Sequence, residues 1–482
     1  MSWILGAIYL LNFITILTIL FVERKKQSIA FTWILIMTFL PVVGFILYPF
    51  LGRNLRPNQK KLFKLKREFD ILYSERLQKK NLLFNEDTAS YIDENTHKYQ
   101  GLISMNYNAG NSVYYQDNNI DIFTKCTDKF NSLLKDIENA NDTIHMLYYI
   151  INNDEIGSEV VNLLTKKAKE GVEVRLLYDH VGSILTPQKM FRNLIKAGGN
   201  VCRFFPLSLG TYTRVNYRNH RKIVIIDGKI GYIGGMNIGD EYLGLHKKLT
   251  PWRDTHLRIT GTSVYALQER FLMDWCYASN TMKDIAAATL SKFFPPFQSQ
   301  GNIGLQVLSS GPDVSGEQIK RGYIKMITSA KEKIFIQTPY FIPDEPFLEA
   351  LQIAALSGVD VRIMLPSIAD HIIVNHATTS YINDVLPYGI KVYLYQGFIH
   401  SKMIVIDGEV TSIGTANMDV RSFSSNFEIN TFIYNTEFSN KCNDIFEKDM
   451  AESKLVTKET YASRGRIAKI KEGLCRLLSP LL

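Results

Sequence analysis

Two stretches of the sequence repeat each other, and this duplication constrains the fold more than any other feature. The first runs from Asn219 to Gly228 and the second from Ile399 to Gly408. Each contains a His-x-Lys pair, four apolar residues and Asp-Gly, and each is followed by Ile-Gly-x-x-Asn at the same distance. Matching residues are 180 positions apart, so the copies align without a gap. Because the polar positions agree while the apolar ones vary, the repeat indicates a duplicated catalytic half.

The His-x-Lys pairs lie in short, apolar, β-branched runs that predict buried strands. Residues i and i+2 of a strand share a face, so His220 and Lys222 are expected to point the same way, as are His400 and Lys402. An imidazole beside an ammonium group makes sense if both contact one anion, with the histidine attacking and the lysine neutralising its oxygens. A single such pair is usually a surface pair, but two copies with the same flanks favour function.

Asp227 and Asp407 each precede a glycine at the end of a predicted strand, and Asp-Gly favours a tight hairpin turn. The Gly-x-x-Asn that follows would begin the next element, where small residues let an anionic ligand come close to Asn237 and Asn417. Metal binding is a poor account of the motifs, because lysine is not a ligand and no second histidine or cysteine lies at ligand spacing. These residues therefore predict an anion site that needs neither metal nor cofactor.

The paired motifs resemble the His-x-Lys-x4-Asp signatures of the phospholipase D superfamily, and the chain resembles the bacterial cardiolipin synthases of that superfamily. The six motif residues match the signature without a departure. They are His220, Lys222, Asp227, His400, Lys402 and Asp407. The likeness covers nearly the full length and includes residues 252–256, 338–344, 417–423, 426–430 and 478–482.

This resemblance implies an α/β fold of two pseudo-symmetric phospholipase D-like α/β/α halves that share one active site, preceded by an N-terminal transmembrane helical hairpin. It also implies that one histidine attacks a phosphodiester phosphorus to form a phosphohistidine, while the other protonates the leaving alkoxide and then deprotonates the incoming alcohol. By superfamily analogy, His220 is expected to be the nucleophile and His400 the acid and base. The lysines, with Asn237 and Asn417, are expected to hold the phosphate oxygens.

Four carboxylates complete the predicted site. Asp227 and Asp407 are counted among the catalytic residues, although their position at turns also allows an orienting role. Asp254 and Glu428 follow the motif histidine of their own half by 34 and 28 residues. In the superfamily a downstream acidic residue contacts the motif histidine, and such a contact fixes the tautomer and raises the basicity of the imidazole. The alternative for each is a salt bridge with a nearby arginine at a strand end.

By the same resemblance, the expected reaction is a reversible phosphatidyl transfer between two molecules of phosphatidylglycerol that yields cardiolipin and glycerol. Water as the acceptor would make the chain a membrane-bound phospholipase D-type hydrolase, and another alcohol would make it a different phosphatidyltransferase. A lipid-binding scaffold is disfavoured, because all six motif residues are intact. The net charge of +8 permits a nucleic-acid substrate, but the membrane segments argue against nucleic acid as a partner.

Two uncharged stretches, residues 3–22 and 30–51, are each long enough to cross a bilayer core and predict a transmembrane hairpin. A signal peptide is disfavoured because Met1-Ser2 carries no basic residue. Three basic residues lie in the connection at 24–26, whereas seven lie between Arg53 and Arg67. This balance predicts a multi-pass protein of the bacterial cell membrane, with the catalytic part and the N-terminus in the cytoplasm. An anionic phospholipid membrane is thus an expected partner.

Helix and strand patterns alternate from Ile120 onward and predict a βαβ unit in each half. The segments 171–175 and 358–362 are near copies that mark the same strand in both. The five cysteines are scattered and odd in number, which predicts reduced thiols rather than a disulfide framework.

The domain boundaries follow from these patterns. We predict a transmembrane hairpin at 1–52, a basic amphipathic linker at 53–105, a first half at 106–297 and a second half at 298–482. Within the linker, residues 58–80 have the spacing of a basic helix. The second half ends in a basic amphipathic helix that either docks on the protein or touches the membrane.

Overall fold

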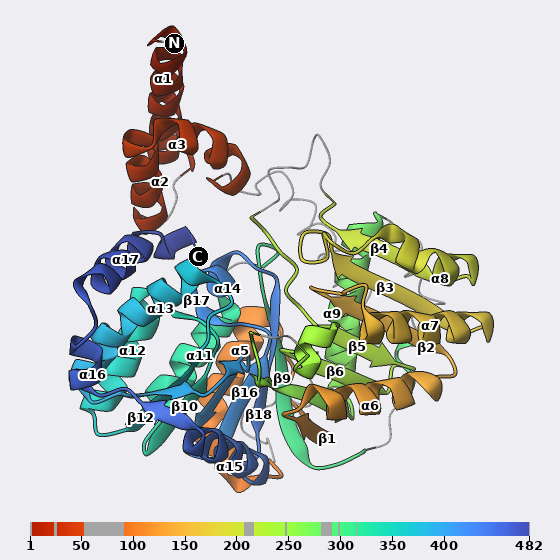
Figure 1. The fold of residues 1–482 in the computed structure, drawn as a ribbon. Helices are drawn as coiled ribbons and strands as arrows, with labels where there is room; N and C mark the ends of the chain where they lie inside the picture. Colours follow the sequence, from red (N-terminus) through yellow and green to blue (C-terminus); the bar gives the residue numbers. More distant parts are fainter. Residues whose placement is uncertain are drawn as a thin grey trace.

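A single 15-stranded sheet runs through both halves of the protein. Figure 1 shows the two halves side by side, with the N-terminal helices standing above the second half. The computed structural model describes residues 2–23, 27–52, 91–206, 216–245, 248–280, 292–296, 299–314 and 316–481.

The first half contributes seven strands in the spatial order β4-β3-β2-β5-β6-β8-β1. β2, β3 and β4 pair in parallel, and the other pairs are antiparallel. Amphipathic helices connect the parallel strands, as crossover connections require. The strands are β1 (Tyr115–Phe123), β2 (Thr143–Tyr148), β3 (Glu173–Asp179), β4 (Asn200–Phe204), β5 (Ile223–Ile226), β6 (Ile230–Gly234) and β8 (His256–Thr260). The helices are α6 (Cys126–Glu138), α7 (Glu155–Lys169), α8 (Arg192–Lys196) and α9 (Val264–Ser279).

The second half repeats this order as β13-β12-β10-β15-β16-β18-β9, with β19 added at the edge. β10, β12 and β13 are again parallel. The strands are β9 (Ile303–Ser310), β10 (Lys333–Gln337), β12 (Asp360–Pro366), β13 (Lys391–Tyr395), β15 (Met403–Ile406), β16 (Val410–Gly414), β18 (Glu428–Tyr434) and β19 (Ser453–Leu455). The helices are α11 (Gln318–Ser329), α12 (Glu345–Leu356), α13 (Ile372–Val385), α14 (Val420–Ser424), α15 (Thr436–Ala451), α16 (Lys458–Ala462) and α17 (Arg466–Leu477).

The halves join where β1 pairs antiparallel with β9, so that Tyr115 lies opposite Leu305. Because β1 and β9 hold equivalent places, the pseudo-twofold axis passes between them. One hydrophobic core also crosses this seam and buries Phe271 and Trp275 of α9 together with Phe446 of α15. The expected fold class, two α/β halves of one repeated design, is confirmed.

Residues 91–105 differ from the expectation of a linker. They form η3 (Glu94–Tyr99) and most of α5 (Gln100–Gly110), which pack on the second half although they precede the first. Leu102 and Ile103 of α5 are fully buried beside Tyr323 of α11. Their apolar side chains therefore complete the core of the second half. The predicted basic helix at 58–80 lies outside the described residues.

The N-terminal segment also differs from a hairpin of two full spans. α1 (Ser2–Thr18) continues into η1 (Ile19–Glu23), and Trp3–Phe21 is long and apolar enough to cross a membrane. The second stretch breaks into α2 (Gln27–Phe39), α3 (Pro41–Leu47) and η2 (Tyr48–Gly52). Proline lacks the backbone N–H of an interior helical residue, so Pro41 begins a new helix. At 1.5 Å per residue, α2 is only about 20 Å long, short of the roughly 30 Å bilayer core.

Hydrogen bonds among the N-terminal helices show which part of α1 lies beside the end of α2. The side-chain amide of Asn12, midway along α1, donates to the carbonyls of Met37 (3.3 Å) and Pro41 (2.9 Å). Near the middle of α2, the Thr32 hydroxyl donates to the carbonyl of Leu477, 3.3 Å away in the C-terminal helix α17. α2 therefore starts beside the catalytic part and reaches only the middle of α1.

Candidate active site

The His-x-Lys pairs lie immediately before a strand rather than within one. His220 and Lys222 precede β5, and His400 and Lys402 precede β15. All four side chains are buried or nearly so. Each lysine ammonium donates to the carbonyl of its own motif histidine, at 2.7 Å in the first half and 2.6 Å in the second. The i and i+2 residues of each motif are thus held together by a direct contact.

The motif aspartates lie at the opposite end of the same strands. Asp227 and Asp407 have φ values of 52° and 55°, and the following glycines have 64° and 72°, the left-handed geometry of a primed hairpin turn. The Asp227 carboxylate accepts backbone N–H bonds from residues 141–143 at 2.8–2.9 Å. Asp407 makes the same three bonds to residues 331–333. This geometry favours the orienting role over a catalytic one, because both carboxylates tie a turn to the start of β2 or β10.

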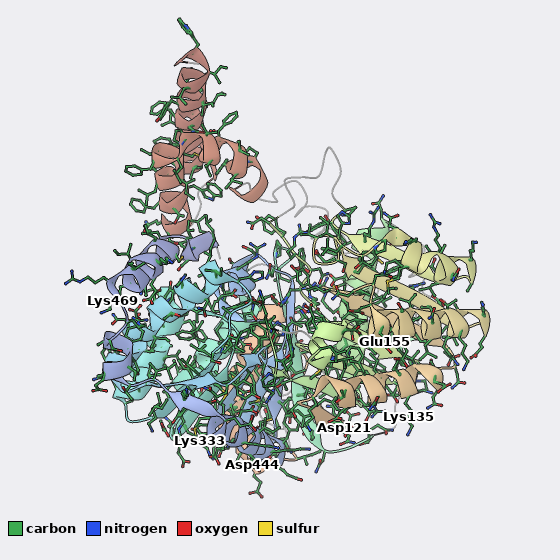
Figure 2. The ribbon with its side chains drawn as sticks, in the orientation of Figure 1. Asp121, Lys135, Glu155, Lys333, Asp444 and Lys469 are labelled. Atoms are coloured by element: carbon green, nitrogen blue, oxygen red, sulfur yellow. The ribbon has the colours of Figure 1, made fainter. Side chains whose placement is uncertain are left out.

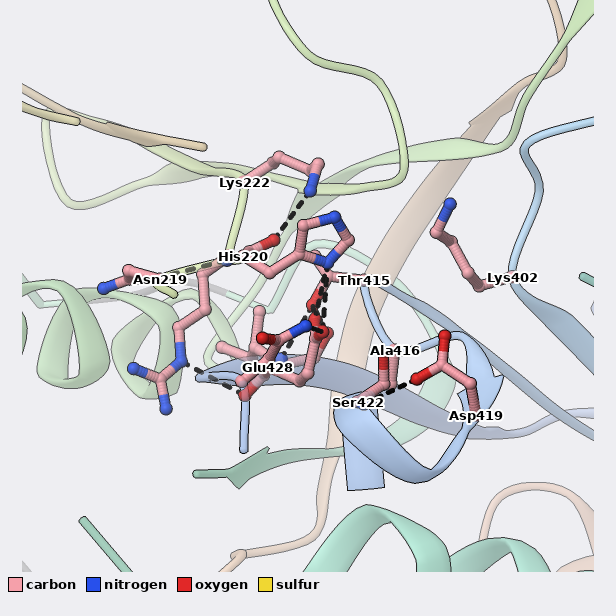
Figure 3. A network of polar contacts seen from close by, with 12 residues as sticks. Asn219, His220, Lys222, Lys402, Thr415, Ala416, Asp419, Ser422 and Glu428 are labelled. Atoms are coloured by element: carbon pink, nitrogen blue, oxygen red, sulfur yellow. Dashed lines mark hydrogen bonds and ion pairs between the residues drawn. The ribbon is translucent and has the colours of Figure 1, made fainter. Parts of the chain in front are cut away.

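Each motif histidine contacts a carboxylate from the other half. Nδ1 of His220 lies 3.0 Å from both carboxylate oxygens of Glu428. Nδ1 of His400 lies 2.7 Å from Oδ2 of Asp254. Figure 3 shows Glu428 below the His220 ring, Lys222 above it and Lys402 to its right. The two carboxylates therefore belong to the site, but in crossed rather than own-half pairs.

Short backbone pairings between the halves produce this crossing. Asn219 forms a parallel bridge with Phe427, and the His220 amide donates to the Phe427 carbonyl at 3.0 Å. The equivalent pairing joins β14 (Phe398–Ile399) to β7 (Trp252–Arg253), where the His400 amide donates to the Arg253 carbonyl at 2.6 Å. The residue after each pairing partner is the carboxylate. These backbone pairings thus place each carboxylate beside the motif histidine of the other half.

The carboxylates do not form the salt bridges considered as the alternative. The Arg253 guanidinium pairs with Asp449 at 2.7 Å and contacts Asp254 only through its backbone carbonyl. Arg421 donates to both oxygens of Asn216, and Glu428 instead accepts from the Thr415 hydroxyl at 2.6 Å. The side chains of Asp254 and Glu428 therefore contact the motif histidines and not the nearby arginines.

Burial sets the protonation of the site. It lowers the pKa of the His220 imidazole to about 4, although Glu428 opposes the effect, and it also lowers the pKa of His400. Burial lowers the pKa of Lys222 to about 7 and of Lys402 to about 8. Glu428 is held below its ordinary pKa by His220 and Lys222, even though its burial raises that pKa. A bound anion would favour the charged lysines.

Both imidazoles face one cavity of about 460 Å³. Asn237 and Asn417 line it from symmetric positions, and Asn237 is tied to the Ile150 amide and to the Tyr242 hydroxyl. The carbonyl oxygen of the Asn417 amide group is buried with no hydrogen-bond partner in the described part of the chain. Sequence reasoning missed several lining residues, which carry no repeat signal: Tyr149, Arg218, Asp370, Asp419 and Arg421.

Across the described ranges, no group of three or more His, Cys, Asp or Glu side chains is placed to hold a metal ion. Nδ1 of each histidine faces a carboxylate, which leaves each Nε2 to react. Two such imidazoles and two lysines around one cavity fit nucleophilic attack on a phosphodiester with general acid catalysis by the second histidine.

The fold and the paired motifs define a member of the phospholipase D superfamily. The family model "Cardiolipin synthase, PLD-like domain" matches residues 133–275 and 323–450, and "Phospholipase_D-nuclease N-terminal" matches residues 10–53. The chain therefore belongs to the cardiolipin synthase family of that superfamily.

Curated relatives match over the whole chain. A cardiolipin synthase of Listeria monocytogenes is 46% identical and the major cardiolipin synthase of Bacillus subtilis is 47% identical, each covering 100% of this chain and 99% of its own length. Among solved structures, a phosphatidylserine synthase of Haemophilus influenzae aligns with a TM-score of 0.60 at 14% identity. It covers 80% of this chain and 100% of its own, and it shows the same fold.

Proposed function

We propose that this chain transfers a phosphatidyl group from one phosphatidylglycerol to another, giving cardiolipin and glycerol. The observation that carries the proposal is the pair of imidazoles facing one cavity, each backed by a carboxylate of the other half. Full-length identity to cardiolipin synthases supports this substrate class.

In the first step, Nε2 of His220 attacks the phosphorus of the donor lipid. The P–N bond forms as the bond between phosphorus and the glycerol oxygen breaks, and His400 gives its Nε2 proton to the leaving glycerol. Superfamily analogy assigns the attack to His220, whose pKa of about 4 keeps it neutral at pH 7; burial lowers the pKa of His400 as well. The Nδ1–H of His220 then donates to Glu428, which leaves the Nε2 lone pair exposed.

In the second step, His400 takes the proton of the acceptor hydroxyl, whose oxygen attacks the phosphorus and displaces His220. The new P–O bond completes cardiolipin and restores both histidines. Asp254 stabilises the imidazolium form of His400 that alternates with the neutral one. Lys222, Lys402 and the two asparagines hold the phosphate oxygens, where negative charge gathers in both transition states.

The test is turnover of labelled phosphatidylglycerol by purified, detergent-solubilised protein in the presence of a chelator. The expected products are cardiolipin and an equimolar amount of glycerol, both lost in His220→Ala and in His400→Ala. His97→Ala, an exposed histidine away from the cavity, is the matched control. Phosphatidic acid as the main lipid product would instead support the hydrolase, and no turnover would contradict phosphatidyl transfer.

The apolar helix α1 supports anchoring in the membrane, and we propose an arrangement with a single full span. α1 crosses the bilayer, while α2 and α3 enter to mid-depth and turn, as the contacts of Asn12 with Met37 and Pro41 suggest. Glu23 and Gln27 then lie on the catalytic side. In the sequence, basic residues follow directly after Glu23 and after Gly52, and this excess of positive charge favours a cytoplasmic catalytic part.

The C-terminal helix α17 extends the surface that faces the membrane. In Figure 1 it lies directly below α2, and Leu481, just after it, packs against the core of the anchor. Ile467, Ile470 and Leu474 are 61–72% exposed along it. Lys469, labelled in Figure 2, projects outward from the same helix. We propose that α17 lies in the headgroup layer, with its apolar side chains among the lipids and its cations on anionic headgroups.

A further inference from the structure

Two arginines line the catalytic cavity beyond the motif residues. Arg218 stands two residues before His220, and Arg421 lies in α14 of the other half. Neither belongs to the His-x-Lys motifs or to the crossed carboxylate pairs. The cavity therefore contains two cations besides the motif residues, and the carboxylates of Glu241, Asp370 and Asp419 line it as well.

The partners of the two guanidinium groups differ. Arg218 pairs with the fully buried carboxylate of Asp179 at 3.3 Å. Arg421 donates to Oδ1 of Asn216 at 3.0 Å and to its carbonyl at 2.8 Å, and both acceptors are neutral. In the described part of the chain, Arg421 has no carboxylate at ion-pair distance. A largely buried guanidinium with only dipolar partners leaves N–H donors and a full charge for an anion.

The charges around Arg421 also bear on whether it can bind an anion. Burial lowers the pKa of Arg421, and repulsion from Arg218 lowers it further, against Tyr149 and Asp419, which raise it. Burial also raises the pKa of Asp419 to about 6, so this carboxylate loses its charge only as the pH falls below neutral. An anion between the two arginines would remove their mutual repulsion.

The proposed reaction requires a second anion site, and this argument rests on the proposed function. The donor phosphate is held by the histidines, lysines and asparagines. The acceptor lipid has its own phosphodiester, one glycerol away from the hydroxyl that attacks. Free glycerol and water, the competing acceptors, have none. A second phosphate site would therefore hold only the lipid acceptor.

We propose that Arg421, with Arg218, binds the phosphodiester of the acceptor lipid and directs its free hydroxyl to the phosphatidyl-enzyme. Arginine suits this task because its planar fork matches two phosphate oxygens at once. The site acts in the second step and has no part in the first. It is a specificity site that favours a lipid acceptor over water.

Two reactions of one preparation separate this role from catalysis. Exchange of labelled glycerol into phosphatidylglycerol reports formation and reversal of the phosphatidyl-enzyme without a lipid acceptor. Cardiolipin formation adds the lipid acceptor. Arg421→Gln should keep glycerol exchange near the wild-type rate while cardiolipin formation falls by about tenfold or more. Arg421→Lys should recover part of the loss, because it keeps the charge but not the fork.

Arg192→Gln, at an exposed site on α8, is the matched control and should change neither rate. Equal loss of exchange and cardiolipin formation in Arg421→Gln would overturn the proposal, because Arg421 would then serve the reacting phosphate or the fold. Unchanged cardiolipin formation would overturn it as well. If the wild-type protein exchanges no glycerol, the phosphatidyl-transfer function itself fails, and that outcome is distinct from both.

Discussion

At the scale of single residues, the motif aspartates are expected to differ from the other motif residues, because they stabilise a turn and take no part in the reaction. Asp227→Asn keeps a residue that tolerates the left-handed turn but removes the charge that accepts three backbone N–H bonds. We expect a loss of about 1–2 kcal/mol in the free energy of unfolding, with kcat of the folded protein unchanged. Thermal unfolding and labelled-lipid turnover in detergent measure both.

Asp407→Asn should behave in the same way, since its three bonds are equivalent. Asp444→Asn, at an exposed position of α15, serves as the control for the loss of one negative charge. An Asp227→Asn protein with unchanged stability but a lower kcat would contradict the orienting role. It would indicate that Asp227 takes part in the reaction.

The two lysines predict the pH dependence. Their pKa values of about 7 and 8 mean that, as pH rises, they lose their charge well below the ordinary lysine value of 10.5. Phosphate binding weakens with that loss, so kcat/KM for phosphatidylglycerol should fall on the alkaline side between pH 7 and 8. The pH profile of initial rates at low substrate tests this. A kcat/KM that stays constant up to pH 10.5 would show that both lysines remain charged in the unliganded site.

Residue-level prediction from the sequence relied on the internal repeat. The motif histidines, lysines and asparagines stand out because each has a counterpart 180 residues away. Arg218 and Arg421 have no such counterpart and reach the cavity through neighbouring loops and α14. Their place depends on tertiary packing, which no local pattern records.

At the scale of elements, the second apolar stretch shows what a hydropathy pattern leaves out. Residues 30–51 have the length of a span, but Pro41 interrupts the helix and α3 begins there. Hydropathy counts apolar residues and ignores such a break. The regular strands and helices of each half were easier to predict, because their period-2 and period-3.6 patterns are local.

The single-span arrangement places Ser2 on the side of the membrane opposite to the catalytic halves. In whole bacterial cells, Ser2→Cys should react with a membrane-impermeant maleimide. Asp444→Cys, on the catalytic part, should react only after the cells are opened. Two full spans would put both positions on the same side, so protection of Ser2→Cys in intact cells would contradict the re-entrant arrangement.

At the scale of the whole molecule, neither half is complete without the other. His220 depends on Glu428, and His400 depends on Asp254, at 3.0 Å and 2.7 Å. Sequence spacing suggested the four residues but not the exchange, because the pairings of Asn219 with Phe427 and of β14 with β7 join segments far apart in the chain. The duplicated halves therefore form one shared site rather than two separate ones.

The different roles proposed for His220 and His400 can be tested with a donor whose leaving group needs no proton, the p-nitrophenyl ester of phosphatidic acid. His400→Ala should release nitrophenolate in a single burst and accumulate a phosphatidyl group on His220, because only the second step still lacks its base. His220→Ala should show no burst. Peptide mass spectrometry under non-acidic conditions locates the modified residue. A burst from His220→Ala of equal size, or a phosphatidyl group on any other residue of His400→Ala, would contradict the account.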